Sequence, residues 1–316
     1  MIRSVLCPIL GIKKPIFQGG MAWIADASLS AAVSEAGGLG ILSAICGGAE
    51  ALRAEIRKAR ELTRKPFGVN IMLAAPDAAE SARVVVEEGV GIVTTGAGSP
   101  APYMEAWKAA GIRVIPVVAS VAYARKMEQL GATAVIAEGA ESGGHIGETH
   151  TLPLVPQVVD AVNIPVIAAG GIADGRGAAA AFMLGAAGVQ VGTRFLTAHE
   201  CRVHPVYKER LLKASDIGTM VTGKRLGDAV RCLKTPFAKQ FARLEANPAA
   251  SDQEIRAFGT GSLRKAVFQG DLSGGSFLSG EAAGLLTRCQ SAADIVEDIM
   301  GGAERLLSQA NELVEK

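Results

Sequence analysis

The fold is clearest in the stretch Thr133-Ala-Val-Ile-Ala-Glu-Gly-Ala-Glu-Ser-Gly-Gly-His-Ile-Gly147, where an apolar run passes directly into a glycine-rich loop. The apolar run at residues 133–137 predicts a buried strand. Gly143 and Gly144 leave no Cβ in the way, so the backbone can approach a flat ligand closely. His145 brings to the same place the one side chain that exchanges protons near neutral pH. We interpret the loop as a site of chemistry; the alternative is a loop histidine at the start of a helix.

The same pattern recurs along the chain. Eight short apolar runs are predicted as strands, at residues 15–18, 38–43, 68–72, 91–94, 113–117, 133–137, 165–169 and 188–191. Amphipathic stretches of helical length lie between them, among them residues 49–62, 77–88, 121–130 and 176–184. Eight βα repeats favour a closed (β/α)8 TIM barrel over an open doubly wound sheet.

The alternation stops after the eighth strand. Residues 201–277 are polar and helical in pattern, and we predict that they form a cap inserted before a final helix at about residues 280–313. The predicted division is therefore a barrel from residues 1–200 and 278–316 and a cap from 201–277. From Cys201 to Gly275, 13 Lys and Arg stand against 7 Asp and Glu, a net charge of +6, while the rest of the chain carries −5. This basic region is either an ordinary solvated surface or a docking face for an anionic cofactor or partner.

Composition excludes several classes of function. Aromatic residues make up only 4% of the 316 residues and the net charge is +1, which argues against a nucleic-acid partner. The five cysteines show no CxxC or Cys/His spacing, so we expect no metal site and no disulfide framework. No apolar run is long enough for a membrane span or a signal peptide. We therefore expect a soluble cytoplasmic protein.

In a TIM barrel the active site forms from the loops at the carboxyl ends of the strands. In this chain those loops are rich in glycine and polar residues, at 18–22, 70–72, 94–98, 138–147, 169–174 and 190–195. Gly170-Gly171 and Gly192-Thr193 follow the last two strands, each leading toward a helix. Unhindered amide groups at a helix start suit a phosphate, and barrels commonly bind phosphate at these two loops. The alternative is that these glycines serve only the packing of strand ends.

These motifs resemble those of a known family. The chain from Pro15-Ile-Phe-Gln-Gly-Gly-Met-Ala22 through the histidine loop to Gln190-Val-Gly-Thr193 is similar to the flavin-dependent enoyl-acyl carrier protein reductases (type II) of bacterial fatty acid synthesis. Their superfamily includes the nitronate monooxygenases. Gly68-Val-Asn-Ile-Met-Leu73, Ile146 and the basic segment with Gly227-Asp-Ala-Val-Arg231 favour the reductase group.

The resemblance implies FMN as cofactor. Gly20, Met21 and Ala22 would line the isoalloxazine ring with backbone, and the Asn70 side chain would bond it. The full set expected to bind the cofactor is Gly20, Met21, Ala22, Asn70, Thr95, Glu138, Gly143, Gly170, Gly171, Gln190, Gly192 and Thr193. Glu138 stands where nitronate enzymes often have glutamine, and its charge beside a reduced anionic flavin would be costly unless paired.

The resemblance also implies the reaction. NADH or NADPH would supply hydride to reduce the trans-2 double bond of an enoyl-acyl carrier protein in the last step of the fatty acid elongation cycle. His145 would deliver the proton or bond the developing enolate. A homodimer and activation by a monovalent cation are suggested, although no residue pattern establishes either. Lys224, Arg225, Arg231 and Lys234 are candidates to dock the acidic carrier protein or to bind the nucleotide phosphates.

Two other functions stay open, and a third is disfavoured by the positions of the cysteines. A nitronate monooxygenase would oxidise alkyl nitronates with O2 and hardly consume NADH. A flavin-binding barrel without catalysis would have no need of His145 at a strand end. The phosphate-binding barrels of nucleotide metabolism depend on a loop cysteine, and none of the five cysteines lies on the loop at residues 138–147.

Overall fold

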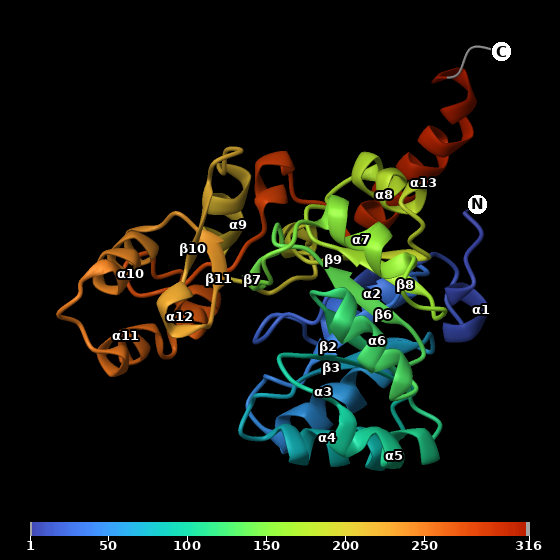
Figure 1. The fold of residues 1–316 in the computed structure, drawn as a ribbon, viewed down its shortest axis with the longest axis horizontal. Helices are drawn as coiled ribbons and strands as arrows, with labels where there is room; N and C mark the ends of the chain where they lie inside the picture. The colour runs from blue at the N-terminus through green and yellow to red at the C-terminus, as the bar shows by residue number, and fades with distance from the viewer. Residues whose placement is uncertain (1, 314–316) are drawn as a thin grey trace.

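The protein folds as a barrel of parallel strands with further helices beside it (Figure 1). The computed structural model describes residues 2–313. Within them, eight strands pair in the order β1-β9-β8-β6-β5-β4-β3-β2. They are β1 (Ile16–Gln18), β2 (Gly40–Ser43), β3 (Phe67–Met72), β4 (Ile92–Gly96), β5 (Arg113–Val118), β6 (Val135–Glu138), β8 (Val166–Ala169) and β9 (Gly188–Val191). Each predicted strand is present with its ends shifted by at most two residues, and the predicted (β/α)8 barrel is confirmed.

The barrel closes between β1 and β2. The Gln18 amide N–H donates to the Leu39 carbonyl at 2.9 Å, and the Leu39 amide donates to the Ile16 carbonyl at 2.8 Å. Because β1 has only three residues, the fully buried Gln18 side chain extends the pairing. Its Oε1 accepts from the Ile41 amide at 3.2 Å and its Nε2 donates to the Ile41 carbonyl at 3.3 Å. The side-chain amide of Gln18 thus continues the hydrogen bonding between β1 and β2.

The amino-terminal helix α1 (Leu6–Leu10) occupies the end of the barrel at which the strands begin. Leu6 and Leu10 belong to the same apolar cluster as Ile115, Ile136 and Ile167 of the barrel interior. The opposite end, where the strands finish, remains for a ligand.

Helices surround the strands in the alternating order expected of βα repeats. They are α2 (Ala27–Glu35), α3 (Ala49–Leu62), α4 (Ala78–Glu87), α5 (Ala101–Ala109), α6 (Val121–Gln129), α7 (Thr151–Val159), α8 (Gly175–Met183) and α13 (Ala292–Ser308). Helix α13 packs closely on α8, because a Cβ at Gly175 would come within 2.5 Å of the Gly302 carbonyl carbon.

The final helix is shorter than predicted. It begins at Ala292, where the Ser291 hydroxyl accepts from the Asp294 amide at 3.0 Å as an N-cap. The residues before it form a 3₁₀ turn, η3 (Glu281–Leu285), and extended chain. The Gly280 amide donates to Thr193 Oγ1 at 2.9 Å, so this segment is held at the barrel mouth instead of joining the helix.

Residues 201–277 lie to one side of the barrel in Figure 1. They contain α9 (Pro205–Leu212), β10 (Thr219–Thr222), η2 (Lys224–Leu226), β11 (Val230–Leu233), α10 (Pro236–Ala246), α11 (Asp252–Gly259) and α12 (Ser262–Gln269). Strands β10 and β11 form an antiparallel hairpin that the predicted helical cap did not include, and β7 (Gly144–His145) pairs with β11. The division into barrel and cap at residues 200 and 278 stays a prediction; we call residues 201–277 the cap.

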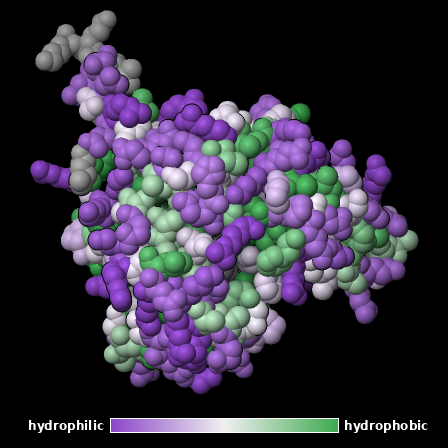
Figure 2. All heavy atoms as spheres, turned by 180° about the vertical axis from the view of Figure 1, so that it is seen from behind, coloured by the Kyte–Doolittle hydropathy of each residue, from purple (hydrophilic) through white to green (hydrophobic). Residues whose placement is uncertain are grey.

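Polar side chains cover most of the face in Figure 2, with apolar residues scattered among them. Among the described residues, no helix combines the length and the apolar character needed to cross a membrane.

Candidate active site

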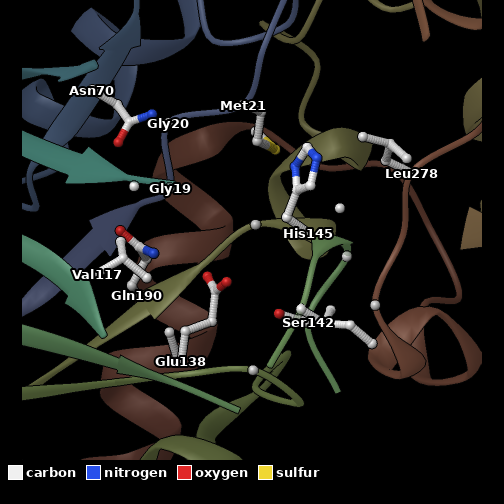
Figure 3. A pocket seen from close by; sticks show the side chains of 18 of the residues that line it. Gly19, Gly20, Met21, Asn70, Val117, Glu138, Ser142, His145, Gln190 and Leu278 are labelled. Atoms are coloured by element: carbon white, nitrogen blue, oxygen red, sulfur yellow. The ribbon is translucent and has the colours of Figure 1, made fainter. Parts of the chain in front are cut away.

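One cavity of about 490 Å³ opens at the carboxyl ends of the barrel strands (Figure 3). Loops from both halves of the barrel line it, together with residues that follow the cap. Twelve of the predicted site residues lie on its wall: Gly20, Met21, Ala22, Asn70, Glu138, Gly143, His145, Gly170, Gly171, Gln190, Gly192 and Thr193. The structure therefore gathers residues separated by up to 173 positions in the sequence around one space.

Thr95 is the exception, because it lies on the other face of β4. Ile92 belongs to the barrel-interior cluster, whereas Val93 packs beneath the outer helices. Side chains alternate along a strand, so Thr94 faces inward and Thr95 outward. The Thr94 hydroxyl hydrogen-bonds Asn70 Oδ1 at 2.9 Å and so supports a cavity residue. This placement differs from the one predicted for Thr95.

Gly20 and Asn70 lie directly against each other in the wall. A Cβ at Gly20 would lie 2.1 Å from the Asn70 Cβ, which is closer than any two carbons can approach without a bond. Only glycine therefore lets the β1 loop lie directly against Asn70. Figure 3 shows the Asn70 amide on the side of the cavity opposite Ser142.

Two glycine amides are available at the ends of β8 and β9. Among the described residues, neither the Gly171 nor the Gly192 N–H group donates a hydrogen bond to another residue. A Cβ at Gly192 would meet only the Met21 Sδ, at 3.9 Å, so it would project into open cavity. The start of α8 is less free than predicted, because the Asp174 carboxylate already accepts from the Arg176 amide at 2.9 Å.

Glu138 is the ionisable group in the cavity with the most altered acidity. It ends β6, and Figure 3 shows its carboxyl group directed into the cavity. Burial raises the pKa of Glu138 to about 7, and the nearby Ser142 hydroxyl opposes part of this rise. The carboxyl group can therefore be neutral or charged near neutral pH.

We expect this burial to appear in the pH dependence of stability. The Glu138 carboxyl group has a pKa of about 7 in the folded protein, against an ordinary value of 4.5. Its contribution to stability is therefore complete below pH 4.5 and is lost as the pH rises through about 7. The melting temperature of the flavin-free protein should therefore fall between about pH 5 and pH 8, and it should fall less in Glu138→Gln. Glu148→Gln, an exposed glutamate of the same loop, is the control. Parallel curves for wild type and Glu138→Gln would contradict the assignment.

His145 is held at the cavity by the cap hairpin. Strand β7 pairs His145 with Val230 of β11, and the Ile146 amide donates to the Ala229 carbonyl at 3.0 Å. The imidazole Nε2 lies 3.0 Å from Asp228 Oδ1, and both side chains are about half exposed. Sequence reasoning did not connect Asp228 with His145, because nothing local relates positions 83 residues apart.

Arg231 fastens the same loop from behind. Its Nε donates to the Ala140 carbonyl at 3.0 Å, and its Nη1 pairs with Glu281 at 2.9 Å. The side chain is buried, so the prediction of Arg231 as a candidate docking cation does not fit the structure. Arg225 is also engaged, with Asp252 at 3.1 Å and with carbonyl groups of the cap.

Glu141 and the segment at residues 278–280 were missed from the sequence. The Glu141 carboxylate accepts from the Thr151 amide at 2.9 Å and hydroxyl at 2.8 Å, and so holds the start of α7. Its carbonyl accepts from the Glu281 amide at 2.9 Å. Leu278 and Gly280 line the cavity, but their sequence carries no motif that would indicate it. Within residues 2–313, no three His, Cys, Asp or Glu side chains come together as a metal site.

Known proteins with several different activities resemble the chain over most of its length. The model of the nitronate monooxygenase family matches residues 3–302. The (3aS,4S,5R,7aS)-5-hydroxy-7a-methyl-1-oxo-octahydro-1H-indene-4-carboxyl-CoA dehydrogenase of Mycobacterium tuberculosis is 36% identical, with 99% of each chain covered. A probable nitronate monooxygenase of Staphylococcus aureus is 31% identical over 84% of this chain and 87% of its own. The solved structure of FabK from Thermotoga maritima has a TM-score of 0.96 and 49% identity, covering 99% of this chain and all of that one.

Proposed function

The chain belongs to the nitronate monooxygenase family of oxidoreductases, and from this we propose that it is an FMN-dependent enoyl-acyl carrier protein reductase that uses NADH or NADPH. The observation that carries the proposal is the likeness to FabK, the flavin-dependent enoyl-acyl carrier protein reductase II, at 49% identity over essentially the whole chain. Fold alone would not support a reaction, since one barrel hosts many chemistries.

The cavity fits FMN, on which FabK and the family's enzymes depend. Its volume of about 490 Å³ lies in the range of small-molecule sites. The wall at Gly20 and Asn70 offers backbone and a side-chain amide to the isoalloxazine ring. The free amides of Gly171 and Gly192 suit the phosphate, because amide N–H groups bind anions when no backbone carbonyl already holds them.

When bound, FMN supplies hydride transfer, and the protein supplies orientation and the proton. Reduction of an enoyl thioester adds hydride at the β-carbon and a proton at the α-carbon, while negative charge develops on the thioester oxygen. We assign to His145 the delivery of that proton or a hydrogen bond to that oxygen. Asp228 orients the imidazole by holding its Nε2, which leaves Nδ1 for the substrate.

A nitronate monooxygenase is the second candidate. It is supported by the family match and by the Staphylococcus aureus relative. It differs in its oxidant, because it would consume O2 with an alkyl nitronate and need no nicotinamide nucleotide.

Two steady-state assays separate the candidates. We expect NADH or NADPH oxidation to depend on a crotonyl thioester, and O2 uptake with an alkyl nitronate to be slower by at least about tenfold in kcat/KM, a difference of about 1.4 kcal/mol in barrier. Nitronate-dependent O2 uptake faster than thioester reduction would favour the second candidate. Both assays use the same FMN-loaded preparation, so cofactor loss cannot mimic either result.

We further propose that the natural substrate is carried by an acyl carrier protein in fatty acid biosynthesis. The exposed cap lysines Lys224 and Lys234 remain as cations that could attract an acidic carrier. The homodimer, the cytoplasmic location and the monovalent cation stay predictions.

A further inference from the structure

A second hollow lies beside the mouth of the main cavity. Helix α12 connects the two, because Leu263 lines the main cavity while other residues of the helix line the hollow. The hollow measures about 330 Å³ and is lined by Gly261, Arg264, Lys265, Phe268 and Gln269. In Figure 1, α12 lies in the cap, which also contains β11, the strand that pairs with the histidine loop.

Trp23 is a barrel residue that follows a residue of the main cavity and contacts a residue of the hollow. It follows Ala22, which lines the main cavity, and its ring packs edge-on against Phe268 at 6.3 Å between centroids. The Trp23 φ of 63° is uncommon for a residue other than glycine, and the Trp23 amide donates to the Ile45 carbonyl at 2.8 Å. The backbone thus fixes the indole ring against Phe268, a residue that lines the hollow.

The hollow is positively charged, and its cations lack acidic partners in the described part of the chain. The guanidinium of Arg264 lies over the Trp23 ring at 5.2 Å, and neither Arg264 nor Lys265 forms an ion pair with a carboxylate of the described residues. Residues 261–270 contain no Asp or Glu. The neighbouring Asp271 carboxylate accepts from the Ser273 and Gly274 amides, at 2.9 and 3.0 Å. Phe268 leaves 54% of its surface exposed, although it is apolar.

We propose that this hollow binds the phosphorylated adenosine tail of a nucleotide whose reactive end enters the main cavity. The inference rests on the proposed function, because that function supplies the reaction at the other end of the nucleotide. Guanidinium and ammonium groups pair with a phosphate, while exposed aromatic rings and a planar guanidinium receive the face of a purine. From Leu263 to Gln269, α12 rises about 9 Å, so a ligand can extend along it from cavity to hollow.

Two molecules carry such a tail: NADPH, the proposed reductant, and a coenzyme A thioester, which replaces the acyl carrier protein thioester in an assay. NADPH has a 2′-phosphate on its adenosine, and a coenzyme A thioester has a 3′-phosphate. Both present the same chemistry, a purine nucleoside with a phosphate on the ribose ring, and the test must tell them apart.

Tryptophan fluorescence of the FMN-loaded protein provides a direct binding assay. The chain has two tryptophans, and Trp107 is fully buried under the outer helices, so a change on titration reports Trp23. We expect saturable binding of 2′,5′-ADP or of 3′,5′-ADP, with 5′-AMP at least about tenfold weaker, since it lacks one charge-assisted contact. Lys265→Gln should weaken the bisphosphate by about tenfold, while Lys239→Gln, an exposed lysine of α10, should not change it.

Steady-state kinetics identifies the source of the tail. If 2′,5′-ADP binds better, Lys265→Gln should raise the KM for NADPH and spare NADH. If 3′,5′-ADP binds better, the variant should raise the KM for crotonyl-coenzyme A and spare crotonyl-N-acetylcysteamine.

The proposal is overturned if neither bisphosphate binds, or if Lys265→Gln and Arg264→Gln both leave their affinities unchanged. The titration needs no turnover. A protein that binds the bisphosphate yet reduces no enoyl thioester would refute the proposed reaction alone, and an active enzyme without bisphosphate binding would refute this inference alone.

Discussion

His145→Ala is expected to keep its FMN and to lose roughly 10²–10⁴-fold of its enoyl-reduction rate, the contribution typical of a general acid. The side chain is about half exposed, and among the described residues its ring approaches a carboxylate only at Asp228, so its removal takes nothing from the apolar core. The measurement compares the visible flavin absorbance per protein with kcat for a crotonyl thioester. A loss of turnover with full flavin content separates chemistry from cofactor binding.

His150→Ala is the matched control for that experiment. His150 lies on the same loop, is exposed and does not line the cavity, so we expect wild-type turnover. If His145→Ala kept turnover within about threefold of wild type, far below the general-acid range, His145 would be a structural residue of the β7 strand.

Gly192→Val is expected to give folded protein with little or no bound FMN. The Gly192 φ of −108° is accessible to valine, and the added Cβ would meet only the Met21 Sδ at 3.9 Å. The new side chain therefore projects into the space that we assign to the phosphate. Flavin content after purification should fall by at least about tenfold, which corresponds to about 1.4 kcal/mol of binding free energy.

Gly91→Val makes the same substitution at a glycine with open space around it, beside the start of β4 and away from the cavity. We expect it to melt like Gly192→Val and to retain its flavin. If Gly192→Val is purified with a full complement of FMN, the β9 loop is not part of the phosphate site.

The barrel could be predicted because its signals are local. Each strand is a short apolar run bounded by glycine, proline or charge, as at Val166–Ala169, and such runs are buried wherever they lie in a parallel sheet. The hairpin β10–β11 was missed because its strands, each of four residues, lie among strong helical patterns. The final helix was predicted too long because the contact from Gly280 to Thr193 cannot be read from a helical pattern.

Much of the candidate site could be predicted for the same reason, since the strand-end loops carry their own glycines. Thr95 was misplaced because a shift of one residue along a strand turns a side chain to the opposite face. Arg231 was predicted in another role, and Asp228 and Glu141 were not predicted as site residues, because their contacts arise from long-range pairing between the cap and the histidine loop. Sequence periodicity carries no information about such pairing.

Anaerobic mixing of the FMN-loaded protein with NADH and NADPH, followed by a crotonyl thioester, tests the central claim most directly. We predict that at least one nucleotide bleaches the visible flavin absorbance within the turnover time, and that the thioester restores it without O2. An absorbance that no nucleotide bleaches on that timescale, or that returns only when O2 is admitted, would contradict an enoyl thioester reductase.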